Sequence, residues 1–403
     1  MGAPAAGSPS AAALPDPAKL ATALRPALTD RGLAGPVGMQ VRDLATGTVL
    51  FDQAADKPDV PASTAKLLTA AVALDRLGPR TRLQTRVFAA GDVLYLVGGG
   101  DPTLTRATTG ALGARVDDLA RQVRAAGVTR ASRVVADATF FSGPTLAPGW
   151  QPYYLNAEIG PVSALSVDAG RRSPSVKATA RTPNPSPDAA NTLRGALSRA
   201  GVRVDGIGAG RVPAGARQVA MVESPTVADL VKRMLTYSDN DLAESLGRQL
   251  AHAAGRPADF NGEVAAVADG LQTLGLPLAG LRMFDSSGLS HDDLVPPSLL
   301  VEVLRAAADP ARPQLRPILD GLPIAGRTGT LADRFRTPET APAAGLVHAK
   351  SGRLAGVAAL AGTARTRSGL VLVFSVRAPS VDLTVGEKAM DRIAATLTRC
   401  GCR

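Results

Sequence analysis

The chain has 403 residues, of which 45% are hydrophobic, and it carries a formal net charge of +10. This length and composition allow a large buried core and two or more domains, and no apolar run of about eighteen residues predicts a membrane span. The positive charge comes mostly from scattered arginines, without a dense basic block interleaved with aromatic residues. That pattern argues against a nucleic-acid partner. A basic surface also suits a polyanionic setting such as a cell envelope.

The two ends of the chain say little about the fold. Residues 1–18 are rich in Pro, Ala, Gly and Ser and lack the charged and apolar regions of a signal peptide, so we interpret them as a flexible leader that a targeting segment once preceded. Cys400 and Cys402 can pair only in an oxidising compartment, and a bridge across one residue is usually strained. Their pairing is left open.

The first third of the chain predicts a hairpin, a helix and two strands. Residues 37–52 alternate in polarity around a Thr-Gly turn, which is typical of a hairpin. Residues 60–79, "VPASTAKLLTAAVALDRLGP", have apolar positions at helical spacing and end in Gly-Pro, so they predict a helix with Ser63 at its N-cap. Strands are expected at 82–88 and 92–102. The glycines that end the second strand lack the spacing of a phosphate-binding loop.

The remaining elements frame a less regular middle region. Residues 105–225 mix short elements with proline-rich breaks, whereas 225–251 is strongly helical except at "YSDND". Residues 345–364 and 369–376 predict buried strands, and 381–399 an amphipathic helix. We therefore expect one α/β unit split by an insertion. The predicted divisions are a leader at 1–18, a discontinuous catalytic domain at 19–80 and 225–403, and inserted material at 81–224.

Three short polar clusters interrupt apolar segments: "STAK" at 63–66, "SDN" at 238–240 and "KSG" at 350–352. Each alone is weak, and on spacing alone a capping serine followed by a solvated lysine is the favoured interpretation of the first. In this order, at a helix start, a helix break and a strand end, they match the set of motifs of active-site serine penicillin-binding proteins and β-lactamases.

The chemistry of these clusters explains why the first contains a lysine in an arginine-rich chain. A serine hydroxyl needs a base to take its proton, and a desolvated lysine can lose its charge, whereas arginine cannot. Burial and repulsion from Lys350 are expected to lower the pKa of Lys66, which then accepts the proton of Ser63. Ser238 would relay a proton to the leaving nitrogen, and Asn240 would hold the substrate amide.

Substrate binding is expected to involve the strand segment after Lys350. Lys350 and Ser351 would orient a terminal carboxylate, and the backbone amides of Ser63 and Arg353 would form the oxyanion hole. The complete predicted set comprises the catalytic residues Ser63, Lys66, Ser238, Asn240 and Lys350 and the substrate-binding residues Asp239, Tyr154, Ser351, Gly352 and Arg353.

Competing assignments are less favourable. Arg327-Thr328-Gly329, within "GRTGTLADRF", offers another basic-hydroxyl-glycine triplet, but its flanks are charged and turn-like, so we favour Lys350. The three histidines, His252, His291 and His348, are expected to be structural, and no G-x-S-x-G elbow surrounds a serine. No closely spaced His/Cys/Asp/Glu set predicts a metal, and no cofactor is expected.

Longer segments give a more specific resemblance. The chain resembles the D-alanyl-D-alanine carboxypeptidases/endopeptidases of the low-molecular-mass, class C penicillin-binding proteins, the peptidase S13 family, from about residue 35 to 395. The segments that carry it include "LYLVGGGDPTL", "GWQPYYLNAEIGPVSALSVDAG", "YSDNDLAESL", "DSSGLSHDDLVPPSLL", "GRTGTLADRF" and "AKSGRLAGVAALAG". In that family "GTLADRF" precedes the KTG segment, which supports Lys350.

The resemblance implies a fold, a substrate and a location. The fold would be an α/β (α+β) penicillin-binding-protein/β-lactamase-like transpeptidase domain, in which helices flank a central antiparallel sheet and an inserted subdomain interrupts the chain. The substrates would be peptidoglycan stem peptides outside the cytoplasm, with β-lactam antibiotics as covalent inhibitors.

Three departures from the family pattern stand out. "KSG" replaces KTG but keeps the hydroxyl, so we expect the chemistry to survive. The gap between Ser63 and Ser238 is shorter than in better-known members, so one inserted subdomain is expected to be reduced or missing. The acidic residue usual after Trp150 is replaced. Trp150, Tyr153 and Tyr154 could border a side-chain pocket, although packing at a subdomain junction is favoured because aromatic residues are usually core.

Three functions follow from the sequence. The first is a DD-peptidase that cleaves D-Ala-D-Ala ends or D-amino-acid cross-links. The second is a serine β-lactamase, against which stand the long insertion and the lack of an obvious glutamate-bearing loop for deacylation. The third is a non-catalytic peptidoglycan-binding envelope protein, which the intact motifs disfavour.

Overall fold

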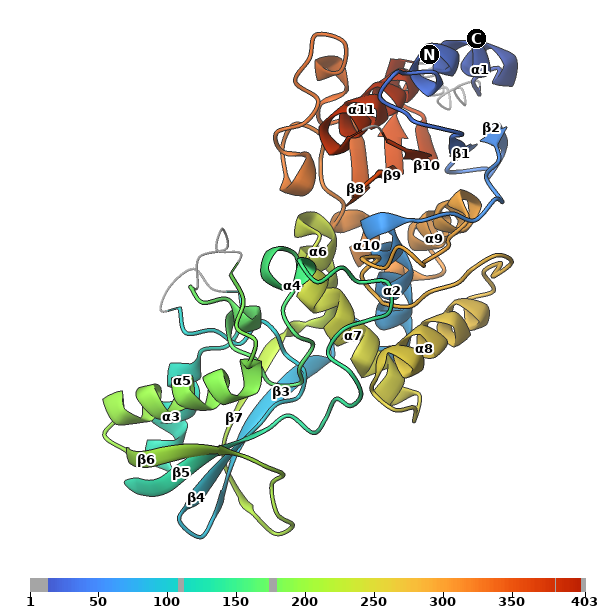
Figure 1. Cartoon of the computed structure of the whole chain (residues 1–403). Coiled ribbons are helices and arrows are strands. Elements are labelled where there is room, and N and C mark those ends of the chain that lie inside the picture. Colours follow the sequence, from blue (N-terminus) through green and yellow to red (C-terminus); the bar gives the residue numbers. More distant parts are fainter. Residues whose placement is uncertain (1–13, 108–111, 174–179, 381, 400–403) are drawn as a thin grey trace, which may run out of the picture.

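Two five-stranded sheets organise the chain, with a layer of helices next to the first (Figure 1). The computed structural model describes residues 14–107, 112–173, 180–380 and 382–399. The first sheet is antiparallel, in the order β2-β1-β10-β9-β8. Its strands are β1 (Gly38–Asp43), β2 (Val49–Gln53), β8 (Val347–Leu354), β9 (Val357–Arg365) and β10 (Val371–Pro379).

Alternating side chains divide the first sheet between two cores. Leu360 and Phe374 belong to the core beneath α1 (Pro17–Leu28) and α11 (Leu383–Arg399). Ala361 and Val373, their neighbours along the strands, face the core formed with the other helices. Since successive strand residues point to opposite faces, a sheet buried on both sides carries apolar residues at nearly every position. The predicted antiparallel sheet between two helical layers is confirmed.

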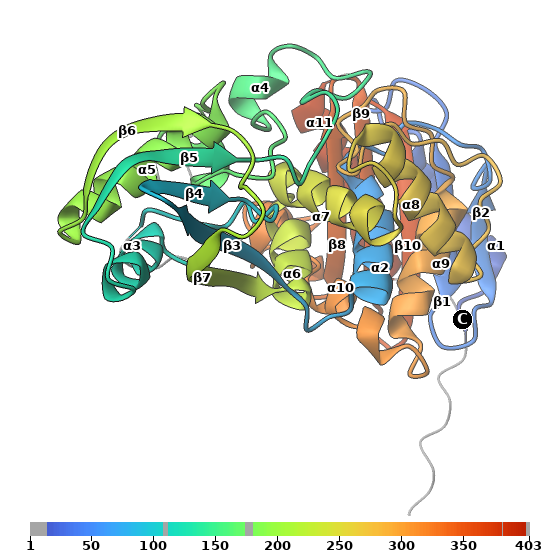
Figure 2. The same cartoon turned by 90° about the horizontal axis from the view of Figure 1, so that it is seen from below.

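The helices of the second core come from distant parts of the sequence. They are α2 (Lys66–Val72), α6 (Val227–Tyr237), α7 (Asn240–Ala253), α8 (Phe260–Thr273), α9 (Pro297–Ala308) and α10 (Pro317–Asp320). All seven residues of α2 are buried among them, and five of the seven are apolar, as a helix surrounded by protein requires. Figure 2 shows α6 and α7 adjoining the second sheet. This packing brings the two helices that flank "SDN" against the helix that follows "STAK".

The second sheet is mixed and has the order β6-β5-β4-β3-β7. Its strands are β3 (Arg82–Ala90), β4 (Val93–Val97), β5 (Arg130–Asp137), β6 (Arg203–Ala209) and β7 (Arg217–Thr226). Two parallel pairings, β4 with β5 and β5 with β6, are joined through α3 (Val116–Ala125) and α5 (Pro185–Arg199), which cover one face. The short helix α4 (Tyr154–Ala157) lies between β5 and α5 in the chain.

Several sequence boundaries shift in the structure. The hairpin at 37–52 is confirmed, whereas the strand predicted for 92–102 ends at Val97. Helix α1 begins at Pro17, capped by Asp16, and so includes the last residues assigned to the leader. The domain boundaries near 80 and 224 stay predictions, and the two cysteines lie outside the described residues. Within the described ranges, no helix combines the length and apolar character required to cross a bilayer.

Candidate active site

The "STAK" segment forms a tight turn that leads into α2. A 3₁₀ turn, Ala62–Ala65, precedes the helix, and Ala62 has a positive φ of 46°. The expectation that Ser63 caps the helix is therefore wrong: the helical path starts one residue earlier, and no side chain caps this turn. Because Ser63 is not used as a cap, its hydroxyl is available to other partners. The strained backbone at Ala62 is of the kind found at functional sites.

Lys66 is completely buried, and its ammonium nitrogen meets three oxygen atoms. Nζ lies 3.0 Å from Ser63 Oγ, 2.6 Å from Asn240 Oδ1 and 2.7 Å from the carbonyl oxygen of Ser287. Burial lowers the pKa of Lys66 to about 8, against the opposing effect of nearby carboxylates, of which Asp285 acts most strongly. The amine thus titrates close to neutral pH while touching the serine hydroxyl.

The "SDN" segment is the junction between α6 and α7. Ser238 adopts a left-handed conformation that ends α6, and Asp239 caps α7 by accepting the N–H of Leu242 at 3.1 Å. Asn240, the first residue of α7, uses both ends of its amide: Oδ1 accepts from Lys66, and Nδ2 donates to the Glu158 carbonyl at 3.0 Å. Two helix ends therefore fix the polar groups of this motif.

The "KSG" segment lies inside β8, not at a strand end as expected, because pairing with β9 continues to Leu354. Lys350 is completely buried and donates to Ser238 Oγ at 2.9 Å and to the Ser351 carbonyl at 2.6 Å. Burial, then repulsion from Lys66, lowers the pKa of Lys350 well below its usual value. Since like charges repel mutually, two protonated lysines in this groove disfavour each other.

The neighbouring strand residues complete this wall of the groove. Ser351 Oγ lies 2.8 Å from Thr330 Oγ1, which belongs to the "GTLADRF" segment. At Gly352 a Cβ atom would lie 2.8 Å from the Pro61 carbonyl oxygen, so glycine permits β8 to approach the serine turn. The Arg353 side chain is exposed and lies 3.9 Å from Glu387. The competing triplet lies in a turn, where Thr328 Oγ1 accepts the N–H of Ile324.

Trp150 and Tyr154 pack as the favoured interpretation expects, whereas Tyr153 does not. Tyr154 is 3% exposed, packs in a small core with Ala62 and Leu354, and places its hydroxyl 3.1 Å from His291 Nε2. Tyr153 is exposed. Of the other histidines, His252 packs against the Phe140 ring, and His348 precedes the motif in β8.

The turn that supports Lys66 was not predicted from the sequence. Asp285 accepts the N–H groups of Ser287, Gly288 and Ser290 at 3.0, 2.6 and 2.7 Å and the indole N–H of Trp150 at 2.6 Å. The turn presents the Ser287 carbonyl to Lys66. The segment "DSSGLS" was visible in the sequence, but only the fold shows which carbonyl faces the lysine.

A cavity of about 460 Å³ opens beside "SDN". Its walls carry both signs of charge, since Glu158 and Asp239 line it together with Arg171, Arg181 and Arg233. Arg181 donates to Asp241 at 2.8 Å. The site therefore adjoins a volume large enough for part of a peptide. Across the described ranges, no three His, Cys, Asp or Glu side chains converge as metal ligands would.

The structure thus brings together Ser63, Lys66 and Asn240 at one contact and Ser238 with Lys350 at the next. A serine hydroxyl beside a buried amine of lowered pKa, with a second lysine on an edge strand, is the arrangement expected of a serine enzyme.

Comparison with known proteins agrees with this class. The model of the D-Ala-D-Ala carboxypeptidase 3 (S13) family matches residues 20–183 and 174–400, so the chain belongs to this family. "Carboxypeptidase Rv3627c" of Mycobacterium tuberculosis is 41% identical over 97% of this chain and 86% of its own length. "Carboxypeptidase DacB" of Mycolicibacterium smegmatis is 40% identical, with 95% and 84% covered.

The fold is likewise that of a known structure. Penicillin-binding protein 4 of Haemophilus influenzae superposes with a TM-score of 0.76 at 22% identity, covering 94% of this chain and 98% of the other. The penicillin-binding-protein fold and the enzyme class expected from the sequence, a serine-type D-Ala-D-Ala carboxypeptidase, are confirmed.

Proposed function

We propose that this chain removes the terminal D-alanine from D-Ala-D-Ala ends of peptidoglycan stem peptides through an acyl-enzyme on Ser63. The observation that carries the assignment of nucleophile and base is the 3.0 Å contact between Ser63 Oγ and the buried amine of Lys66. The free amine of Lys66 takes the hydroxyl proton as Ser63 Oγ attacks the carbonyl carbon of the penultimate D-alanine. The electron pair moves to the carbonyl oxygen and forms a tetrahedral intermediate.

Collapse of this intermediate expels the terminal D-alanine. Its nitrogen needs a proton as the C–N bond breaks, and the proton held by Lys66 reaches it through Ser238 Oγ. Lys350, 2.9 Å from that oxygen, orients the hydroxyl. A water molecule then attacks the ester and gives a proton to Lys66, which passes it to Ser63 Oγ as the ester C–O bond breaks and the shortened peptide leaves. General acid–base catalysis of this kind typically contributes about 10²–10⁴-fold in rate.

The edge strand β8 and Asn240 orient the substrate. The terminal carboxylate binds Lys350 and the paired hydroxyls of Ser351 and Thr330, which lie 2.8 Å apart. The backbone amides of Ser63 and Arg353 receive the developing oxyanion, and removal of one such donor typically costs about 3 kcal/mol. Asn240, anchored on the Glu158 carbonyl, holds the amide of the substrate's acyl portion.

β-Lactam antibiotics enter the same path as covalent inhibitors, because their strained amide acylates Ser63 and leaves an ester that resists water. Haemophilus penicillin-binding protein 4 is known in complex with a β-lactam, which supports this assignment. Since the substrate is a cell-wall polymer, we place the activity outside the cytoplasm.

Labelling with fluorescent penicillin tests the proposal. Wild type should form one stable adduct, located on the Ser63 peptide by mass spectrometry, and should release D-alanine from a peptide ending in D-Ala-D-Ala. Ser63→Ala should lose both signals. Unchanged labelling of Ser63→Ala would defeat the nucleophile assignment, and rapid turnover of nitrocefin by wild type would favour a β-lactamase.

A further inference from the structure

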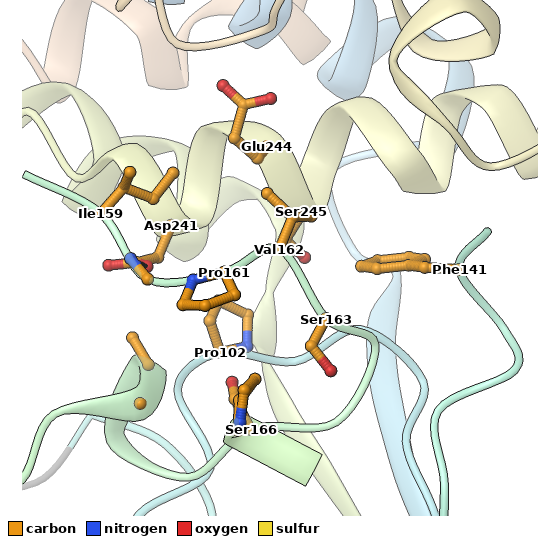
Figure 3. A pocket seen from close by; sticks show the side chains of 14 residues that line it. Pro102, Phe141, Ile159, Pro161, Val162, Ser163, Ser166, Asp241, Glu244 and Ser245 are labelled. Carbon is orange, nitrogen blue, oxygen red and sulfur yellow. Dashed lines mark hydrogen bonds between the residues drawn. The ribbon is translucent and has the colours of Figure 1, made fainter. Parts of the chain in front are cut away.

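Glu244 is a buried carboxylate that the reaction above does not use. It lies on α7, one turn after Asn240, and is 1% exposed. Figure 3 shows the cavity between α7 and the segment containing Pro161 and Ser163, with the Glu244 carboxylate pointing away from both residues. The side chain is therefore directed into the protein, where placing a charge is costly unless it has partners.

The partners of Glu244 lie in the turn that supports Lys66. Its Oε2 accepts the N–H of Ser286 at 3.3 Å, and the Ser286 hydroxyl donates to Glu263 Oε1 at 3.1 Å. The next residue, Ser287, supplies the carbonyl oxygen 2.7 Å from Lys66 Nζ. Glu244 thus holds the backbone N–H of Ser286, two peptide units before the carbonyl that fixes the base.

Glu244 also acts on Lys66 through its charge. Its negative charge favours the protonated amine and opposes the effect of burial on the pKa of Lys66. Burial raises the pKa of Glu244 itself to about 7, with a further contribution from Asp285. The charge on Glu244 therefore changes within the pH range in which the base titrates.

We propose that Glu244 is a positioning residue for the general base, which holds the turn under Lys66 and places a negative charge near its amine. The inference rests on the proposed role of Lys66 in acylation. Other charged groups act on the two residues from every side. They are Asp239, Glu158, Asp285 and Lys350 around Lys66, and Glu263, Asp285 and Asp293 around Glu244, with Arg248 paired to Glu263.

Two substitutions separate the effect of the Glu244 charge from the effect of its side-chain length. Glu244→Gln keeps the acceptor for Ser286 but removes the charge, so the pH midpoint of penicillin acylation should fall by about one unit, as expected for loss of a nearby opposite charge. At pH 7 the acylation rate of this variant should then be about fivefold higher than that of wild type. Glu244→Asp keeps the charge but is one methylene shorter, so it should lower the plateau and leave the midpoint near the wild-type value.

The matched control is Glu223→Gln on the exposed surface of β7, which should change neither midpoint nor plateau. The experiment measures the second-order rate of fluorescent-penicillin acylation from pH 5.5 to 9.5, with thermal unfolding of each variant as a check of folding. If Glu244→Gln is folded and labelled at Ser63 but keeps the wild-type midpoint, the inference fails while the proposed function stands. If the acylation rate of wild type does not depend on pH, the proposed role of Lys66 as the base is wrong.

If Glu244→Gln does not fold, Glu263→Gln provides a second test of the proposal in the same acylation assay. Glu263 lies next to Glu244 and accepts a hydrogen bond from the hydroxyl of the same serine. The hydrogen bond from Glu263 lowers the pKa of Glu244, so its weakening should raise that pKa and leave Glu244 uncharged to higher pH. The acylation midpoint should then move downward, and an upward shift would contradict the proposal.

Discussion

The pH dependence of acylation follows directly from the environment of Lys66. With a pKa of about 8, the fraction of free amine is about 1% at pH 6, about 9% at pH 7 and about 50% at pH 8. If the free amine is the base, the second-order acylation rate should rise about fiftyfold between pH 6 and pH 8 and level off above pH 9. The acylation rate should increase, not decrease, with pH because only the deprotonated amine can accept the Ser63 proton.

Timed labelling with fluorescent penicillin measures this rate. Lys66→Arg serves as the control, since arginine stays protonated, and it should lose the pH-dependent limb together with about 10²–10⁴-fold in rate. Between pH 6 and pH 8, a change in stability linked to Lys66 does not imitate this rise in the acylation rate. The folded-state pKa of Lys66 lies below its unfolded value of 10.5, so the unfolded chain binds more protons between about pH 8 and 10.5, and the contribution of this group to stability increases with pH.

A rate that stays flat between pH 6 and pH 8 would refute the argument. So would a wild-type limb that persists unchanged in Lys66→Arg, because the titrating group would then be elsewhere. A midpoint shifted toward 10 would show that burial does not lower the pKa of this lysine in the folded enzyme.

Three further outcomes are expected. Asn240→Asp places a negative charge 2.6 Å from Lys66 Nζ and should move the acylation midpoint to higher pH; a downward shift in the same labelling assay would contradict this. Gly288→Ala should abolish labelling because its Cβ would collide with the carbonyl just before the nucleophile, whereas Gly275→Ala, also at positive φ but in open space, should cost only about 1 kcal/mol and label normally. Arg248→Met leaves a buried glutamate unpaired and should lower the free energy of unfolding by about 3–5 kcal/mol in urea titrations, a loss that an exposed pair would not produce.

Local pattern was sufficient for the elements around the site. The hairpin, the helix of residue 66 and the strands β9 and β10 follow from apolar spacing and glycine punctuation, because these segments are buried on the faces that their sequences make apolar. Two strands of the second sheet, β3 and β4, were expected, but the sheet itself was not predicted. Its parallel strands are separated by helices, so their pairing depends on contacts between residues far apart in the chain.

The predicted motifs meet in space, but two were misplaced locally. Ser63 was expected as a helix cap because serine is common there, yet Ala62 at positive φ starts the turn earlier. Lys350 was expected at a strand end, whereas β8 continues to Leu354 because β9 pairs with it throughout. The support from Asp285 and Glu244 was missed because no short motif records which buried carboxylate lies under a lysine.

By itself, the sequence determined the chemistry: a serine three residues before a lysine, two later polar triplets and the residue types that an acylation reaction needs. Only the tertiary structure decided how reactive these groups are. A pKa depends on burial and on charges from other elements, and those distances exist only when α2, α7, β8 and the turn at Asp285 have packed together.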